Sequence, residues 1–436
     1  MNAMTAEDRP AGSAEAAARK WQLRAALFFF EGHLSVSPSV MGAALELRDR
    51  GYRVDIFCNR PPIDVPRPDL PPGISLHEHI PWTRKIIGPL IERLRRRQLR
   101  RLGRMGAEGR TQEDISRLRT RSKALLALLE LPQFVLYCRR RYQPADLVIA
   151  FDMTGLAAMS GTVPAATAFV YWSLEIMPLD EVPDPVSLWL KRHELRRLSG
   201  ARAIVVQAPE RRALFERDIK LPLDQYLEIP NGPPHAVSAD LPKNFFSSRF
   251  PIPPGARVVL HAGLISSSYL SLEVAHTVPN WPPDFVLVFH ERQHRDPREP
   301  YLQAVQRAGG ERIFLSLDPV SFDKVDEVYA GADIGLVCYA GTAIDANQTT
   351  AWASSGKLVY CLRHGLPVVI VSSPCPSILA DWPFGVWTPG VDGVGPALAK
   401  IAADYDAYAA RARQAYAAHF DFSAAFGRLM GIVSKV

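Results

Sequence analysis

The chain has 436 residues, 47% of them hydrophobic and 22% charged, with a formal net charge of +6. These values exclude a disordered chain and a single small core, and they fit a soluble globular protein of two domains of about 200 residues each. The positive charge is local, because residues 83–123 alone carry a net charge of +10 and the rest of the chain sums to −4.

Short β-type runs alternate with helical patterns in the first half of the chain, which predicts a parallel sheet built from βαβ units. Strands are predicted at residues 25–30, 52–58, 74–78, 146–151, 166–172 and 202–207. Helices are predicted at residues 39–50, 120–141, 185–198 and 209–217.

The stretch "YLEIPNGPP" (226–234) interrupts this alternation, and Pro- and Ser-rich sequence follows it up to Pro254. Such a break predicts a domain boundary. Strands of a second series are predicted at residues 257–263, 284–290, 312–316, 332–339 and 366–371, and helices at 395–415 and 420–433. The sequence thus predicts a tail at 1–20, a first domain at 21–228 with a basic insertion near 83–123, a second domain at 229–415 and a closing helix at 416–436. Ligands are expected in the cleft between the carboxyl ends of the two sheets.

The basic insertion has two interpretations. Its Arg and Lys residues are interleaved with apolar ones, as in "IIGPLIERLRRRQLRRLGRM" (86–105), which gives it an amphipathic character. A solvated helix face is one interpretation, and docking onto an anionic membrane surface is the other, since each surface Lys or Arg contributes roughly 1 kcal/mol there. No RNA-binding aromatic motif or helix-turn-helix pattern accompanies the segment, so nucleic acid is not an expected partner.

Targeting and redox signals are few. No apolar run reaches the ~18 residues that span a bilayer, and residues 1–20 lack the apolar stretch of a signal peptide. The five cysteines are scattered, without a CxxC or a Cys/His metal spacing. We therefore expect reduced thiols in a cytoplasmic protein, with peripheral attachment to the inner face of the cell membrane if the basic insertion docks there.

The stretch "ASSGKLVYCLRHGLPVVIV" (353–371) predicts a loop, a helix and a strand. Gly356 and Lys357 stand at the helix start, and Gly365 ends the helix. A glycine-bearing helix start offers free N–H groups and a positive dipole end, and the lysine adds a cation, so this pattern favours a phosphate cradle. It is neither a Walker A loop nor a GxGxxG fingerprint. An ordinary capped helix remains the alternative.

Three stretches resemble the GT-B glycosyltransferases, in particular the large retaining family that uses nucleotide sugars (family 4-like, glycosyl transferases group 1). These are "ADIGLVCY…SSGKLVYCLRHGLPVV" within residues 332–371, "IPNGPP" (229–234) as the interdomain linker, and "FDFSAAFGRLMGIV" (420–433) as the closing helix. The resemblance implies two Rossmann-like parallel-sheet domains that face each other across a cleft. It also implies a nucleotide-diphosphate sugar as donor.

The resemblance further implies roles for individual residues. At the donor diphosphate it places Ser355, Gly356, Lys357 and the amide of Leu358, where developing negative charge would be stabilised. Other donor-binding positions that it implies are Asp345 and Asn347 near the transferred sugar, Leu317 against the nucleobase, and Gly263, Arg292 and Tyr360.

The chain departs from the family pattern at two places. The family often carries two glutamates separated by seven residues, the second of which binds the ribose; here Trp352 and Tyr360 occupy these positions. A tyrosine cannot make the bidentate contact of a carboxylate. The Arg/Lys pair usual after the first strand of the second domain is also missing. Replacement cations are expected from "FHERQHR" (289–295), at Arg292, His294 or Arg295, unless this is a solvated charged loop.

Three side chains of the first domain follow predicted strands and are candidates for catalysis together with Lys357. His33 could hydrogen-bond a sugar or phosphate oxygen, although a lone loop histidine is more often simply exposed. Asp152 could orient a hydroxyl, and equally could cap the next helix, which is the interpretation we favour for that residue alone. Glu175 could bind a hydroxyl or be solvated.

These observations predict a hexosyltransferase-like enzyme. It would move a sugar from a nucleotide-diphosphate sugar to a glycan, lipid-linked or small-molecule acceptor, with retention and without a metal or other cofactor. A non-catalytic GT-B protein that binds a partner or a glycan is the alternative, and a nucleotide-sugar epimerase of the same fold is a third interpretation.

Overall fold

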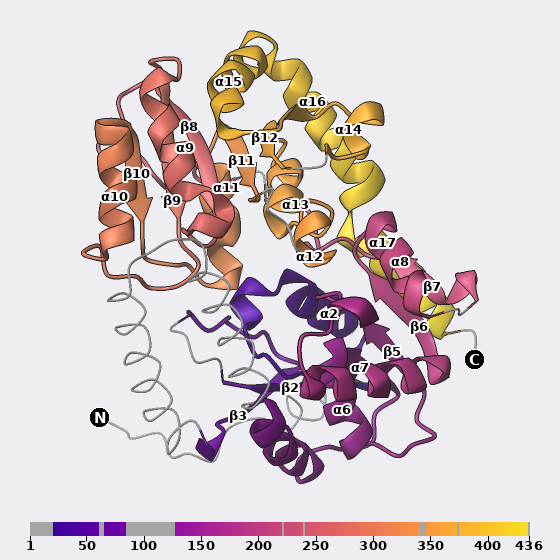
Figure 1. Ribbon diagram of the computed structural model, residues 1–436. Coiled ribbons are helices and arrows are strands. Elements are labelled where there is room, and N and C mark those ends of the chain that lie inside the picture. Colours follow the sequence, from indigo (N-terminus) through magenta and orange to yellow (C-terminus); the bar gives the residue numbers. More distant parts are fainter. Residues whose placement is uncertain are drawn as a thin grey trace, which may run out of the picture.

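The computed structural model describes residues 21–60, 65–83, 127–219, 222–238, 240–340, 346–372 and 375–434. The predicted tail and nearly all of the basic insertion lie outside these residues. The described chain forms two parallel sheets, of seven and six strands, each flanked by helices. Figure 1 shows the two Rossmann-like domains, with the second drawn above the first, which confirms the predicted α/β fold class.

The first sheet has the strand order β3-β2-β1-β4-β5-β6-β7, and all of its strand pairs are parallel. Two of its central strands, "LVIAF" (147–151) and "FVYW" (169–172), are apolar throughout and buried on both faces, as parallel sheets covered by helices require. Its strands are β1 (Leu23–Phe29), β2 (Tyr52–Asn59), β3 (Ile74–His79), β4 (Leu147–Phe151), β5 (Phe169–Trp172), β6 (Ala201–Val206) and β7 (Tyr226–Glu228). Its helices are α2 (Pro38–Asp49), α6 (Asp152–Thr162), α7 (Pro185–Arg197) and α8 (Pro209–Asp218).

The second sheet has the order β10-β9-β8-β11-β12-β13 and is also parallel. Its strands are β8 (Arg257–Ala262), β9 (Phe285–His290), β10 (Ile313–Ser316), β11 (Ile334–Cys338), β12 (Val368–Val371) and β13 (Gly385–Thr388). Its helices are α9 (Ser271–Thr277), α10 (Pro300–Gly309), α11 (Val325–Ala330), α12 (Ala346–Thr349), α13 (Gly356–Arg363), α14 (Ile378–Asp381), α15 (Val394–Ala403) and α16 (Tyr405–Ala415). The helical stretch predicted at 395–415 is two helices separated at Asp404.

Local sequence signals set the ends of the helices that matter for the cleft. Pro38 occupies the first position of α2, where its missing N–H and fixed φ are compatible with a helix start. The Ser355 side chain caps α13 by accepting from the amide of Leu358. Gly365 follows α13 at φ +68°, a left-handed conformation that glycine adopts without strain.

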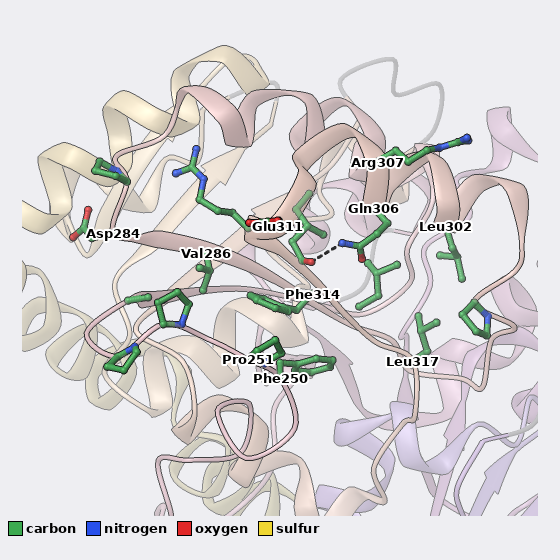
Figure 2. A pocket seen from close by; sticks show the side chains of 18 of the residues that line it. Phe250, Pro251, Asp284, Val286, Leu302, Gln306, Arg307, Glu311, Phe314 and Leu317 are labelled. Atoms are coloured by element: carbon green, nitrogen blue, oxygen red, sulfur yellow. Dashed lines mark hydrogen bonds between the residues drawn. The ribbon is translucent and has the colours of Figure 1, made fainter.

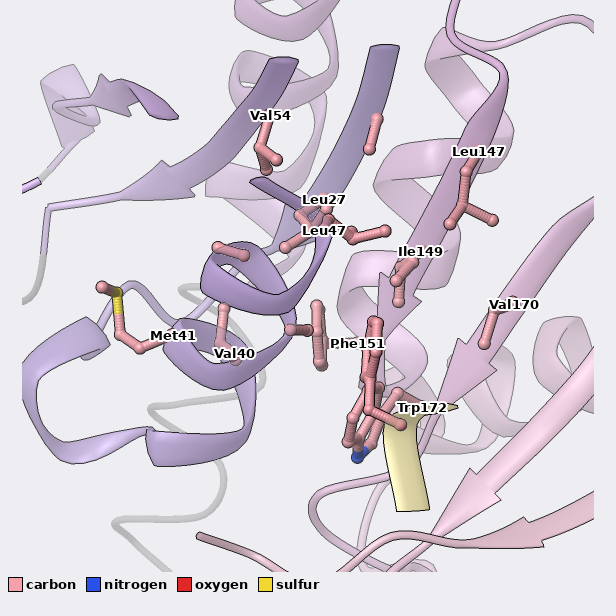
Figure 3. Close-up of a cluster of buried hydrophobic side chains, with 14 of the residues drawn as sticks. Leu27, Val40, Met41, Leu47, Val54, Leu147, Ile149, Phe151, Val170 and Trp172 are labelled. Atoms are coloured by element: carbon pink, nitrogen blue, oxygen red, sulfur yellow. The ribbon is translucent and has the colours of Figure 1, made fainter. Parts of the chain in front are cut away.

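The last helix, α17 (Phe422–Val433), belongs by its packing to the first domain. Phe422 and Phe426 stack on Trp172 of β5, with ring centroids 6.0 and 6.4 Å apart. Gly42 lets α2 approach closely, because a Cβ there would lie 2.7 Å from the Phe422 ring. Figure 3 shows the core that results, in which α2 and the inner face of β1, β4 and β5 meet near Trp172.

Candidate active site

A cavity of about 530 Å³ lies between the two domains. On the second domain it is lined by the loops after β8, β9, β10 and β11, that is, by the carboxyl ends of parallel strands. β8 and β11 are neighbours in the sheet although the chain runs from β8 to β9, so the cavity lies at the topological switch point, where α/β sheets bind ligands. On the first domain it is lined by Ser35, Val36, Pro38, Glu175 and Arg211, and Asn231 of the linker completes it.

Two helix N-termini meet at this cavity. Gly356 begins α13 and Pro38 begins α2, and a Cβ on Gly356 would lie 3.6 Å from the Pro38 ring. Asn231 ties them together, accepting from Ser39 Oγ at 2.8 Å and donating to the Ser354 carbonyl at 3.1 Å. The positive ends of two helix dipoles therefore face one space, which favours an anion there.

Lys357 supplies the cation at this place. Its Nζ is buried, has no hydrogen-bond partner among the described residues, and lies 4.2 and 5.1 Å from the ring centroids of Tyr269 and Tyr339. Burial, assisted by the nearby Arg292 charge, lowers the pKa of Lys357 to about 8. Gly263, at φ +121°, lies against the lysine stem, since a Cβ there would be 3.6 Å from Lys357 Cδ. A desolvated ammonium between two aromatic rings, with no acceptor among the described residues, is an incomplete anion site.

The amide of Leu358 does not have the role that the resemblance implies. It donates to Ser355 Oγ at 3.3 Å, so it serves the helix cap. The first-turn amides of Gly356 and Lys357 belong to the end of the helix that faces the cavity.

The loop after β9 contains one cation that reaches the cavity, Arg292. Arg295 is bound by Glu291 and Glu299, with N–O distances of 3.1 and 2.5 Å. His294 lies 3.4 Å from Asp318 and does not line the cavity. Of the three replacement cations considered from the sequence, the structure therefore brings only Arg292 to the site.

Tyr360 also lines the cavity, but as part of an apolar wall. It stacks on Tyr329 with ring centroids 4.9 Å apart and an angle of 10° between the rings. Val320, Val325 and Val328 complete this wall. The carboxylates that line the described part of the cavity are Glu175 and Glu291, and the latter is fully buried and engaged with Arg295.

Asp152 does not cap α6, so the interpretation favoured from the sequence is wrong. It lies inside the first turn of α6, at φ +57°, and its Oδ1 accepts from the amides of Leu174 and Glu175 at 2.6 and 3.0 Å. Burial, assisted by the Glu175 charge, raises the pKa of Asp152 to about 8. Asp152 thus anchors the loop after β5 that carries Glu175.

The remaining predicted positions are distributed as follows. Asn347 lines the cavity and also contacts the first domain through Ile176 and Arg211. His33 belongs to the same loop as Ser35 but does not itself line the cavity. Asp345 lies outside the described residues.

Leu317 lines a different hollow. This hollow, about 1180 Å³ in volume, lies beside edge strand β10 and outside the cleft between the domains (Figure 2). Its two arginines donate to backbone carbonyls: Arg312 to Trp281 and Pro282, and Arg307 to Gln303. This hollow is the larger space, but its walls are mainly apolar and both of its arginines already donate to backbone carbonyls. The cavity between the domains is therefore the better anion site.

Sequence reasoning missed Arg211, Asn231, Tyr339 and Tyr329 as site residues. Arg211 had a usable signal, because it follows strand β6 in the first turn of the helix "PERRALF". The tyrosines had none, because the sequence does not show that Tyr339 lies beside Lys357 or that Tyr329 stacks on Tyr360.

Two Rossmann-like domains with a ligand cavity between their sheets define the GT-B fold, and comparison with solved structures gives the same result. Sucrose-phosphate synthase (tll1590) from Thermosynechococcus elongatus matches with a TM-score of 0.61 and 15% identity, over 94% of this chain and 98% of that chain. Anabaena Alr3699/HepE, solved with UDP and glucose, matches with a TM-score of 0.57 and 12% identity, over 95% and 100% of the two chains. WaaG, a glycosyltransferase involved in lipopolysaccharide biosynthesis, matches with a TM-score of 0.52 and 15% identity, over 95% and 100%.

All three neighbours are GT-B glycosyltransferases, and at these identities the likeness shows the fold. No protein-family model matches the chain, and no curated protein matches it in sequence.

Proposed function

We propose that this chain is a glycosyltransferase that moves a sugar from a nucleotide-diphosphate donor, held by the second domain, to an acceptor held by the first. The observation that carries the proposal is Lys357, whose buried Nζ faces a cavity between two helix N-termini and finds no hydrogen-bond partner in the part of the chain that the structure describes. A diphosphate would supply the negative charge that these groups favour.

The structural neighbours support uridine diphosphate as the first donor group to test. The HepE neighbour was solved with UDP and with UDP-glucose, and it shares the fold of this chain. The family resemblance of residues 332–371 points to the same class of donor. The acceptor class, a glycan, a lipid-linked sugar or a small molecule, is the open part of the proposal.

The chemistry follows from the charges at the cavity. As the bond between the sugar and the diphosphate breaks, negative charge grows on the leaving phosphate, and Lys357, Arg292 and the start of α13 lie where they would stabilise it. An anion beside Lys357 also keeps its ammonium protonated. In the retaining reaction that we propose, the acceptor oxygen bonds to the same face of the sugar and its proton goes to the leaving phosphate, without a metal. Glu175 would bind an acceptor hydroxyl.

The test is a titration of the protein with UDP, GDP, ADP and UDP-glucose by calorimetry, followed by measurement of UDP release from UDP-glucose with simple sugars and lipid-linked sugars as acceptors. We expect one nucleoside diphosphate to bind and its sugar to be consumed only with an acceptor. The absence of binding by every nucleotide would refute the proposal. Donor binding without transfer would support the non-catalytic alternative, and donor conversion without an acceptor would support the epimerase.

We further propose that the acceptor is reached from an anionic membrane surface. The basic insertion itself lies outside the described residues, but exposed apolar side chains lie on both sides of it in the sequence. They are Ile80, Trp82, Leu128, Leu129 and Leu136. The Trp82 amide donates to the Gln133 side chain at 3.2 Å, so the two flanks are adjacent in space. In the part of the chain that the structure describes, no helix is long and apolar enough to cross a bilayer.

Substitution of Trp82 by alanine together with Leu129 by alanine is expected to reduce cosedimentation with vesicles rich in anionic lipid by at least half, because interfacial apolar anchors add to the electrostatic attraction. The matched control is Trp189→Ala, since Trp189 is 50% exposed against 55% for Trp82 but lies on α7, outside the two segments that flank the basic insertion in the sequence. Equal vesicle binding by wild type and the double variant would contradict the proposal.

A further inference from the structure

The loop after β5, residues 173–176, carries Glu175 into the cavity, and its backbone is held at almost every polar group. Asp152 accepts from the amides of Leu174 and Glu175. Arg211 donates to the Leu174 carbonyl at 2.7 Å, and Ser173 Oγ donates to the Glu175 carbonyl at 3.2 Å. Such a loop has little freedom to move its side chains once all of these contacts are made.

The last of these contacts comes from the other domain. Asn347, on α12, accepts from the Ile176 amide through Oδ1 at 2.7 Å and donates to the Ile176 carbonyl through Nδ2 at 2.6 Å. Its Oδ1 also accepts from the guanidinium of Arg211. The carboxamide therefore pairs with Ile176 as a neighbouring strand would, while binding a buried cation of the first domain.

The surrounding contacts show that α12 is docked on the first domain. The Ala346 amide donates to Glu181 Oε2 at 2.8 Å, and Ala346 packs into the apolar cluster on one face of the first sheet. Arg211 is itself almost fully buried and is held by Gln207 at 2.7 Å. Both sides of the contact are thus fixed, and Asn347 is the side chain that joins them.

We propose that Asn347 is a positioning residue that locks the Glu175 loop to the second domain, so that Glu175 faces the cavity only while the two domains are docked. The position of the Glu175 carboxylate on the acceptor side thereby depends on the second domain, which also carries Lys357. This role replaces the direct contact with the transferred sugar that the sequence predicts for Asn347. The assignment of Glu175 to the acceptor rests on the proposed function, whereas the lock itself does not.

Hydrogen exchange measured by mass spectrometry with single-residue fragmentation tests the lock without any substrate. In Asn347→Ala the Ile176 amide loses its acceptor, so we expect its exchange to accelerate at least tenfold. The amides of Leu174 and Glu175 keep Asp152 as acceptor and should change less than threefold. The matched control is Ser377→Ala, because Ser377 Oγ donates to Glu210 of the first domain at 2.7 Å in an exposed contact between the same domains. We expect no change at Ile176 in that control.

A second variant separates the lock from a loss of folding. Asn347→Asp keeps the acceptor oxygens for Ile176 and Arg211 but loses the donor to the Ile176 carbonyl, so we expect exchange at Ile176 to be faster than in wild type and slower than in Asn347→Ala. Unchanged exchange at Ile176 in Asn347→Ala would overturn the proposal, and so would exchange in Asn347→Asp as fast as in Asn347→Ala with an unchanged melting temperature. Titration of wild type with UDP, GDP, ADP and UDP-glucose distinguishes the two proposals. If wild type binds none of these nucleotides while the exchange results hold, the lock stands and the proposed function falls.

Discussion

Substitution of Lys357 by methionine is expected to weaken UDP binding by about 10- to 100-fold, since a hydrogen bond to a charged group contributes about 1.5–3 kcal/mol. Methionine keeps an unbranched apolar stem between Tyr269 and Tyr339 and removes the charged terminal group. Calorimetric titration with UDP measures the effect. Lys400→Met is the control, because Lys400 is exposed on α15. An affinity within twofold of wild type would contradict the assignment of Lys357 to the diphosphate.

The same substitution has a second expected result, in the free energy of unfolding of the ligand-free protein. The pKa of Lys357 is about 8 in the folded chain against an ordinary 10.5. Between these values the unfolded chain binds the proton more tightly, so the contribution of this group to stability rises with pH from about 8 to 10.5 and is lost as the pH falls through 8. Urea unfolding at pH 7 and pH 10 should show this rise in wild type and not in Lys357→Met.

UDP affinity should fall over the same pH range, because the bound anion requires the ammonium.

Substitution of Phe422 by alanine is expected to lower the free energy of unfolding by about 3–5 kcal/mol, the usual cost of removing a fully buried phenylalanine. The ring is completely buried and stacks between Trp172 and Phe426. The space it leaves is bounded by Gly42 of α2 and by the sheet, which cannot collapse to fill it. Urea unfolding measures the loss.

Arg428→Ala is the control for this prediction, because Arg428 is exposed on the same helix and should change the free energy of unfolding by less than about 0.5 kcal/mol. A loss below 1 kcal/mol in Phe422→Ala would show that α17 contributes little to the first core.

Much of the fold could be predicted from the sequence because its strands are continuous apolar runs that are buried on both faces. β4, for example, was predicted at 146–151 and spans Leu147–Phe151. Strand β13 (Gly385–Thr388) was missed, because four residues at the edge of a sheet carry too weak a pattern. The split of 395–415 into α15 and α16 was missed because Asp404 is an unremarkable residue in a helical pattern.

The candidate site could be predicted only where its chemistry is local. Gly356 and Lys357 are adjacent in the sequence, so the helix start that they form was visible. Asp152 was misjudged because its partners lie 22 and 23 residues away, across a parallel strand pair, whereas a cap is a local contact. The pairing of Asn347 with Ile176 spans 171 residues and depends on how the two domains dock, which no local pattern encodes.

The return of α17 to the first domain affects how the protein can be made. The strands of the first sheet leave the ribosome well before Phe422 and Phe426 do, so the face of the sheet around Trp172 stays uncovered while the whole second domain is translated. The first domain therefore completes its core last although it is synthesised first. An exposed indole and its apolar neighbours on a nascent chain are a surface that chaperones bind and that promotes aggregation. Slower translation of the second domain would lengthen that exposure.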